Sequence, residues 1–218
     1  MKILVTSGGT IEKIDNIRSI VNKSTGKLGA SIADSFINNG ARVFYICATG
    51  AIKPHGSAQI IRISSVAGLQ KAVTTLLQGW DIDVIIHAMA VSDYTVESVT
   101  SKGVELSKTG KISSDHDEIT VNLKQAPKII GQLRSLAPNA TIVGFKLLNN
   151  VEQKILIEAG HGLLQKNNCD FVLANDAAHI KGQAHVGYLI DKSGNYIKCD
   201  TKAAIAKAII KATTRGKL

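Results

Sequence analysis

The stretch that decides the fold is Thr6–Gly29, TSGGTIEKIDNIRSIVNKSTGKLG, which begins where the apolar run Lys2–Thr6 ends. It holds two clusters of small residues, Ser7–Thr10 and Ser24–Gly26, and the second cluster opens an amphipathic, helix-like segment. Glycines let backbone N–H groups approach a phosphate closely, and a helix N-terminus adds unpaired donors and partial positive charge. The stretch therefore predicts a phosphate-binding turn between a strand and a helix.

Composition and charge narrow the class of protein. A chain of 218 residues with 44% hydrophobic residues fits one domain, 1–218, with a sizeable core. The net charge of +9 favours an anionic partner. The basic residues are scattered and no nucleic-acid motif occurs, so small phosphorylated molecules fit better than nucleic acid. Three widely spaced cysteines without a CxxC pair argue against a disulfide framework and a zinc site.

The apolar runs bear on the compartment. They are far too short to span a bilayer, and Met1 leads directly into a strand rather than a signal peptide. We therefore expect a cytoplasmic protein without a membrane partner.

The first half of the chain alternates strands with helices. We expect a helix over Ser24–Asn39, strands over Arg42–Ala48 and Gln59–Ile63, a helix capped by Ser64–Ser65, and a buried strand within Asp83–Val91. This alternation predicts a three-layer, Rossmann-like α/β fold with a mostly parallel sheet and right-handed crossovers.

The second half adds a long polar segment, a flap at about 95–117, which is expected to be a loop that covers a site. After it we expect an edge strand at Ile119–Leu123 and a helix at Ala126–Leu136 with Pro127 in its first turn. Three further elements are a strand within Ala140–Leu148, a helix at Val151–Lys166 and a strand at Asp170–Ala174. The chain should end with a hairpin at His185–Cys199 and a helix capped by Thr201 that frays at Arg215–Lys217.

Four strand ends carry unusual sequence: Ser7–Gly9, Ala88–Tyr94, Gly144–Phe145 and Asn175–Asp176. In open parallel sheets, ligands bind beyond the carboxyl ends of the strands. These segments therefore predict one shared ligand site.

The same segments carry a family resemblance. The pattern GGT-x-E-x-I-D-x-[VI]-R-x-[IL]-x-N-x-[ST]-[ST]-G-[KR]-x-G resembles the opening signature of phosphopantothenate–cysteine ligases. It stands here as Gly8–Thr10, Glu12, Ile14–Asp15, Arg18, Asn22, Ser24–Lys27 and Gly29. Further matches follow in family order at Ala88–Tyr94, Gly110–Ser114, Val143–Phe145 and Ala174–Asp176. They cover nearly the whole chain, and the first is the most specific.

The resemblance implies a ligase of coenzyme A biosynthesis. The carboxylate of 4'-phosphopantothenate would attack the α-phosphate of a nucleoside triphosphate, forming an acyl-nucleotidylate (acyl-CMP) and releasing pyrophosphate. The amine of L-cysteine would then form the amide and release the nucleoside monophosphate. The co-substrate would be CTP or ATP with Mg²⁺ carried by its phosphates, the protein a homodimer, and the decarboxylase of the next step a separate chain, since that domain often precedes this one and nothing precedes Met1 here.

Four residues receive substrate or catalytic roles from the resemblance. Lys111 on the flap would stabilise charge at the α-phosphate, although a solvated loop lysine is the simpler interpretation. Asn22 would donate to the acyl carbonyl in the second step, or only form a turn before the helix. Arg18 would bind the phosphate or carboxylate of the substrate, or only pair with Asp15 or Glu12. Ala90 would line the substrate site.

The resemblance places the nucleotide against Gly8, Gly9, Ser24, Gly26, Ala88, Met89, Asp93, Lys111, Ala126, Pro127 and Phe145. Asp93 would touch the ribose or Mg²⁺, or only end a strand, and no other protein ligand for a metal is expected. Phe145 would pack against the base, or simply belong to the core.

Three departures from the family pattern leave the base open. Leu163 and Asn167 stand where bacterial members often carry two lysines near the triphosphate, with Lys166 one place off. Gln125–Lys128 stands where bacterial members commonly carry K-N-P-D, and Ser113–Ser114 resembles eukaryotic members. We favour CTP, the usual bacterial nucleotide, and keep ATP as the alternative.

Two other function classes remain. An NAD(P)-dependent Rossmann oxidoreductase or epimerase is disfavoured because the first loop is not GxGxxG and no acidic residue ends the strand Arg42–Ala48. A non-catalytic nucleotide or nucleic-acid binding module is compatible with the charge.

Overall fold

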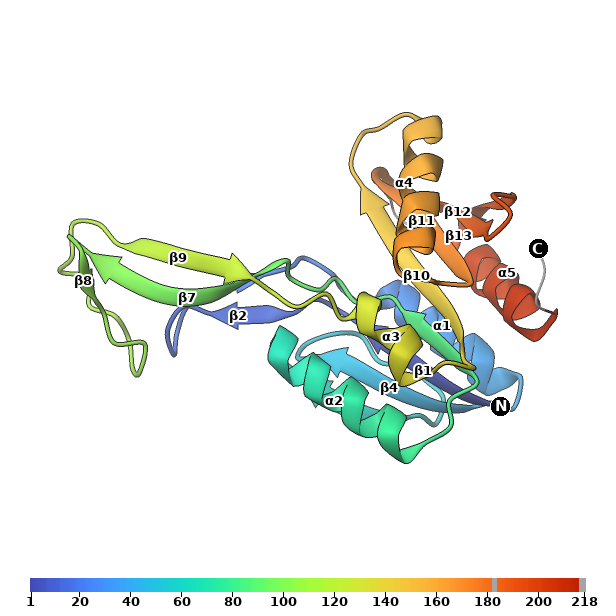
Figure 1. The fold of residues 1–218 in the computed structure, drawn as a ribbon, viewed down its shortest axis with the longest axis horizontal. Helices are drawn as coiled ribbons and strands as arrows, with labels where there is room; N and C mark the ends of the chain where they lie inside the picture. Colours follow the sequence, from blue (N-terminus) through green and yellow to red (C-terminus); the bar gives the residue numbers. More distant parts are fainter. Residues whose placement is uncertain (182–183, 216–218) are drawn as a thin grey trace.

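The computed structural model describes residues 1–181 and 184–215, and within them an eight-stranded sheet forms the centre of the molecule (Figure 1). From one edge to the other its strands are β13 (Tyr196–Thr201), β12 (Ala184–Asp191), β11 (Phe171–Lys181), β10 (Thr141–Leu148), β6 (Val84–His87), β1 (Lys2–Ser7), β4 (Arg42–Ala48) and β5 (Gln59–Ile63). The six strands from β11 to β5 run parallel. In chain order they read 3-2-1-4-5-6 from β5, which is the Rossmann arrangement. The predicted fold class is confirmed.

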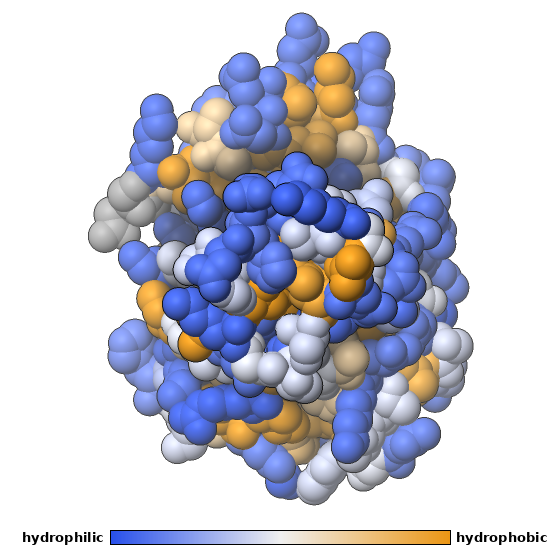
Figure 2. All heavy atoms as spheres, turned by 90° about the vertical axis from the view of Figure 1, so that its left-hand side faces the viewer, coloured by the Kyte–Doolittle hydropathy of each residue, from blue (hydrophilic) through white to orange (hydrophobic). Residues whose placement is uncertain are grey.

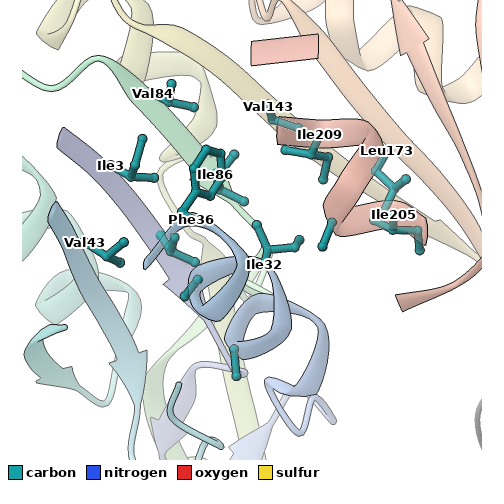
Figure 3. Close-up of a cluster of buried hydrophobic side chains, with 14 of the residues drawn as sticks. Ile3, Ile32, Phe36, Val43, Val84, Ile86, Val143, Leu173, Ile205 and Ile209 are labelled. Atoms are coloured by element: carbon teal, nitrogen blue, oxygen red, sulfur yellow. The ribbon is translucent and has the colours of Figure 1, made fainter. Parts of the chain in front are cut away.

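Helices cover both faces of this sheet, which makes three layers. α1 (Lys27–Asn38) and α5 (Lys202–Arg215) pack on one face, where Ile32, Phe36, Ile205 and Ile209 meet strand residues such as Ile86 (Figure 3). α2 (Val66–Gly79), α3 (Ile130–Leu136) and α4 (Gln153–Lys166) lie on the other face. Because both faces are covered, β1 and β6 are buried along almost their whole length, as their apolar sequences predict.

The C-terminal hairpin is present as predicted. β12 pairs antiparallel with both β11 and β13, which extends the parallel sheet at one edge. The hydroxyl of Thr201 accepts from the backbone N–H of Ala204 and so caps α5 as expected. Most of the segment expected to fray, Arg215–Lys217, lies outside the described residues.

The flap differs from its prediction, because much of it is strand rather than loop. β7 (Tyr94–Ser101), β8 (Val104–Glu105) and β9 (Thr120–Gln125) form a separate three-stranded sheet. Figure 1 shows this sheet projecting from the main body as a long arm. β7 contains four β-branched residues, Thr95, Val96, Val99 and Thr100, and each pairs with a residue of β9. This cross-strand pairing outweighs the polar composition. The expected edge strand at Ile119–Leu123 belongs to the arm.

A second hairpin was not predicted. β2 (Ile11–Lys13) and β3 (Ser19–Val21) pair antiparallel within the segment that joins the glycine turn to α1, and β2 contacts β7 along the arm. Each strand has three residues, too few for a visible alternation of apolar and polar side chains.

Three element boundaries also differ. α1 begins at Lys27, with Gly26 as its N-cap, rather than at Ser24. α3 begins at Ile130, because Ala126 donates its N–H to the carbonyl of Asp93 and remains extended, which leaves Pro127 ahead of the helix. β11 continues to Lys181 because its antiparallel partner β12 extends the pairing.

No helix in the described part of the chain combines the length and the apolar character needed to cross a bilayer.

Candidate active site

The candidate site lies where the strand order of the main sheet reverses, between β1 and β6. Beyond the ends of these strands Gly9 and Ala90 continue the parallel pairing. Ala90 donates its N–H to the carbonyl of Gly8 at 2.8 Å, and its own carbonyl accepts from the N–H of Thr10 at 3.1 Å. The hydroxyl of Thr10 accepts from the N–H of Ser92 at 2.9 Å. Two segments about eighty residues apart are thus joined at the position where Rossmann-like sheets bind ligands.

The glycine turn is built for close packing of backbone. A Cβ added to Gly9 would lie 1.9 Å from the carbonyl oxygen of Asn22, and Asn22 donates its N–H to the carbonyl of Thr10. Gly8 has φ +89°, and its added Cβ would lie 2.7 Å from the Cβ of Ala51. These glycines therefore serve the return of the β2–β3 hairpin as well as any approach of a phosphate.

The start of α1 lies beside this turn. Its N-cap Gly26 has φ +75°, a conformation that suits glycine, and no side chain caps the helix. The hydroxyl of Ser7 donates to the carbonyl of Gly26 at 3.1 Å, which ties the helix start to the end of β1. The first turn contains no acidic residue, and the only side chain that accepts from its described donors is that of Thr25, whose hydroxyl accepts the N–H of Lys27 at a long 3.4 Å. The remaining backbone donors and the partial positive charge are suited to an anion.

His87, at the end of β6, is a buried polar residue that the sequence analysis did not single out. Its Nδ1 lies 2.9 Å from the hydroxyl of Thr6 on β1. Burial lowers the pKa of His87 to about 4, so its ring is neutral at pH 7. One signal was available: His87 is the one titratable side chain inside the apolar run 84–91.

Glu12 was noted only as part of the motif and as a partner for Arg18. Its Oε1 accepts the N–H of Val66 at 2.8 Å, so this carboxylate binds the start of α2. Burial raises the pKa of Glu12 above its ordinary value. The contact holds β2 against the main body.

Asp93 and the segment before α3 lie side by side beyond the end of β6, where Ala126 donates its N–H to the carbonyl of Asp93 at 2.8 Å. Met89 and Ala126 are both buried and belong to the same apolar cluster. Asp93 forms an exposed ion pair with Lys128, while Pro127 next to that lysine is exposed. The carboxylate expected at the ribose or Mg²⁺ is therefore engaged by a cation in this structure.

Ala88 and Phe145 lie on the opposite side of the sheet. Both are partly buried and pack against the cluster beneath α1 and α5, and Ala88 donates its N–H to the carbonyl of Thr6. Phe145 thus has the core contacts of the simpler interpretation and keeps some exposed surface.

Arg18 and Lys111 lie at the tip of the β2–β3 hairpin. The guanidinium of Arg18 donates to Asp15 through Nε at 3.0 Å and Nη2 at 2.5 Å, so the expected alternative of an ion pair with Asp15 is present. Its Nη2 also reaches the carbonyl of Ile112 at 2.8 Å. Lys111, the neighbour of Ile112, is exposed.

The predicted site residues therefore fall into groups. Around the glycine turn the structure gathers Gly8, Gly9, Asn22, Gly26, Ala88 and Ala90, with Ser24 two residues from Gly26 in the chain. Met89, Asp93, Ala126 and Pro127 form a second group beside it, and Phe145 lies on the neighbouring strand. Arg18 and Lys111 form a third group. A rise of ~3.3 Å per residue over the five steps from Thr10 to Asp15 places this tip up to about 17 Å from the turn.

No cluster of three or more His, Cys, Asp or Glu side chains suited to a metal ion occurs among the described residues. Two surface hollows lie elsewhere: one of about 490 Å³ against α4 and β13, and one of about 620 Å³ between β5 and α2. Neither is lined by a predicted site residue.

The strand order, the glycine turn at the reversal point and the helix that starts beside it define an α/β protein with a Rossmann-type sheet. The family of DNA/pantothenate metabolism flavoprotein C-terminal domains matches residues 1–215, and the chain belongs to this family.

Individual relatives agree with the family match. The coenzyme A biosynthesis bifunctional protein CoaBC of Methanocaldococcus jannaschii is 34% identical over 193 residues, which cover 88% of this chain and 45% of that protein. A DNA/pantothenate metabolism flavoprotein from Streptococcus pneumoniae has a crystal structure that superimposes with a TM-score of 0.91 at 33% identity, covering 99% of each chain. The C-terminal domain of a CoaBC protein gives a TM-score of 0.76 at 26% identity over 99% of this chain and 94% of that one. This chain spans about half the length of the curated relatives it matches.

Proposed function

We propose that this protein is a phosphopantothenate–cysteine ligase that acts in coenzyme A biosynthesis in the cytoplasm. The observation that carries the proposal is the backbone pairing of Gly9 with Ala90. It brings two motif segments of the ligase resemblance next to each other, at the reversal point of a Rossmann sheet. The named role of the CoaBC relatives in coenzyme A biosynthesis supports the same pathway.

The proposed reaction has two steps. A carboxylate oxygen of 4'-phosphopantothenate attacks the α-phosphorus of the nucleotide, the bond to the bridging oxygen breaks, and pyrophosphate leaves. The amine of L-cysteine then attacks the acyl carbon of the mixed anhydride, loses a proton, and displaces the nucleoside monophosphate. Both steps build negative charge on oxygen, so cations and N–H donors at the crevice lower their barriers.

The residues divide between the two steps. In the proposal the backbone donors at Gly8, Gly9 and Gly26 hold the phosphates, and Lys111 offsets charge during the first step. Asn22, whose backbone lies against Gly9, donates to the acyl carbonyl in the second. Lys111 lies with the hairpin tip here, so catalysis requires the tip and a crevice to approach each other, within one chain or between two copies.

The nucleotide is proposed to be CTP, with ATP as the alternative. Asp93 would contact the ribose either after its ion pair with Lys128 breaks or while that ion pair is kept. The residues present do not form a protein site for Mg²⁺, because one exposed carboxylate paired with a lysine is a weak ligand set. Any Mg²⁺ would arrive bound to the triphosphate, and no step here depends on its geometry.

A homodimer is proposed on the basis of the arm. Exposed apolar side chains lie along it, including Tyr94, Val104 and Leu123. Figure 2 views the molecule from the side of the arm and shows hydrophobic patches set among hydrophilic atoms. Burial of these side chains against a second copy would stabilise the pair. The decarboxylase of the next step is proposed to be a separate protein.

Pyrophosphate release in the presence of 4'-phosphopantothenate, L-cysteine and either CTP or ATP tests the function. We expect turnover by the wild-type protein and a loss of about 100-fold or more in the first step for Lys111→Gln, the size typical of a lost transition-state donor. Asn22→Asp should still release pyrophosphate but form no amide. The control is Lys102→Gln, an exposed lysine of the arm paired with Asp117.

The proposal is wrong if the purified protein consumes neither nucleotide with both other substrates present. Oxidation of NAD(P)H by the same sample would favour the oxidoreductase alternative instead.

A further inference from the structure

We infer that Asp15 is a positioning residue for Lys111, because its carboxylate holds the flap residue that follows Lys111 in the chain. The inference rests on the proposed function, since it takes Lys111 as the residue that meets the α-phosphate. It adds a link between the β2–β3 hairpin and the flap that the sequence resemblance does not imply.

The first part of the link is local. Asp15 stands at the hairpin tip, and its side chain is fully buried although the neighbouring chain is polar. Its Oδ1 accepts the backbone N–H of Ile17 at 2.8 Å and of Arg18 at 2.7 Å. This pattern is an Asx-type turn, and it shapes the tip.

The second part joins segments more than ninety residues apart. Oδ2 of Asp15 accepts the N–H of Ile112 at 3.1 Å, while Nη2 of Arg18 donates to the carbonyl of Ile112 at 2.8 Å. On the other side of Lys111, the carbonyl of Gly110 accepts the N–H of Asn16 at 3.0 Å. Both chain neighbours of Lys111 are therefore bonded to the hairpin tip, and we call this set of contacts the clasp.

The chemistry of the clasp makes it strong for a surface segment. The Arg18 guanidinium and the backbone donors hold the pKa of Asp15 well below its ordinary range, so the carboxylate is charged at neutral pH. Hydrogen bonds to an ionised group are roughly twice as strong as neutral ones. Ile112 is buried, which anchors the flap by an apolar side chain as well.

The surroundings of Lys111 explain why such an anchor has a catalytic consequence. Gly110 adopts φ +108°, a conformation that suits glycine, and no atom lies within 4 Å of the position of an added Cβ. The backbone before Lys111 is therefore not restrained by packing at Gly110. The residues that follow, Ser113–Glu118, are exposed. Without the clasp, the backbone that carries Lys111 would sample many positions, and a catalytic cation is effective only in a narrow range of geometry.

The test compares Asp15→Asn with Asp117→Asn, a matched loss of charge at an exposed aspartate in the same flap that pairs only with Lys102. We expect Asp15→Asn to lower kcat for pyrophosphate release by about 10- to 100-fold, as for loss of charge-assisted hydrogen bonds. Deuterium uptake over residues 108–114 should rise in the same variant. Asp15→Glu, which keeps the carboxylate, should recover part of both, and Asp117→Asn should change neither.

A double-variant cycle separates positioning from general stability. If Asp15 acts through Lys111, then Asp15→Asn should cause no further loss in a Lys111→Gln background. Multiplied losses in the double variant, or wild-type kcat in Asp15→Asn together with a slow Lys111→Gln, would overturn the inference.

The two levels of proposal fail in different ways. A wild-type protein that releases no pyrophosphate refutes the ligase function, and the clasp then lacks its catalytic purpose. Unchanged deuterium uptake in Asp15→Asn refutes the clasp itself, whatever the activity.

Discussion

His87 illustrates how a single residue can be buried without being part of the apolar core. It is the last residue of β6, and its Nδ1 lies 2.9 Å from the hydroxyl of Thr6 on the adjacent strand. Because the ring is buried in this pairing, the protonated form is disfavoured and the pKa falls to about 4. A neutral imidazole at this position adds no charge that would compete with the backbone donors of the turn.

His87 predicts a pH dependence of stability. The unfolded chain binds a proton at His87 below its ordinary pKa of 6.5, whereas the folded protein does so only near 4. The free energy of unfolding should therefore fall as the pH drops through this window, by up to about 3 kcal/mol from this group. Urea denaturation between pH 7 and pH 5 should show the decline. His87→Gln should reduce the slope without abolishing it, because burial also lowers the pKa of His185 to about 4.

The control for this series is His116→Gln, an exposed histidine of the flap. It should leave the pH profile of the wild type unchanged. An equal slope for the wild type and His87→Gln between pH 7 and pH 5 would show that His87 does not carry the effect.

The β2–β3 hairpin is the element that distinguishes this site from an ordinary dinucleotide turn. At its base the backbone of Asn22 occupies the space that a side chain at position 9 would need. Along its length Glu12 binds the start of α2, and at its tip Asp15 and Arg18 hold the flap. One short hairpin thus contacts the glycine turn, the main body and the arm.

Gly9→Ala tests the base of the hairpin. The new Cβ would lie 1.9 Å from the carbonyl oxygen of Asn22, so the hairpin must move away from the turn. Overpacking of this kind costs about 1–3 kcal/mol of the free energy of unfolding, measured by urea denaturation. Amide formation should fall as well, because Asn22 moves with the backbone.

The matched control is Gly162→Ala in α4, where no atom lies within 4 Å of the added Cβ. Replacing a glycine inside a helix by alanine raises the free energy of unfolding by about 0.5–1 kcal/mol, so this variant should be slightly more stable. Equal stability of Gly9→Ala and the wild type would contradict the packing described for the turn.

The arm gives the protein its asymmetric shape and its exposed apolar surface (Figure 1). Val96 and Leu123 face each other across β7 and β9, with Tyr94 two residues from Val96 on the same strand. Val104 on β8 is 66% exposed, a large value for an apolar side chain. Apolar surface on a projecting element is typical of association with another protein, here proposed to be a second copy.

Light scattering after size exclusion tests the dimer. The wild type should have twice the chain mass of 23.1 kDa. The double variant Leu123→Lys, Val104→Lys should elute as a monomer, because each new charge would be desolvated at the interface. Ile155→Lys, at an exposed apolar residue of α4, should remain dimeric. A monomeric wild type at micromolar concentration would argue against the proposal.

The core of the fold was readable from local patterns. The spacing of apolar residues alone predicts which segments are buried, as in the continuous apolar run 84–86 and the amphipathic helix 66–79. The alternation of such strands and helices implies a parallel sheet. The small-residue clusters that contain Gly8 and Gly26 marked the turn, although α1 begins at Lys27 rather than at the predicted Ser24. The positive φ of both glycines was visible only in the structure. The three-residue strands of the hairpin carried no such signal.

Local spacing also indicated that several strand ends meet at one edge, and the described fold brings Gly9, Asn22 and Ala90 together there. Local spacing could not predict the contacts between distant segments. These are the pairing of β7 with β9, the ion pair of Asp93 with Lys128, and the hydrogen bonds of Asp15 and Arg18 with Ile112. Periodicity reports which side of an element is apolar, whereas these contacts depend on which segments fold next to each other. That choice is made by long-range packing and backbone pairing, so it became visible only in three dimensions.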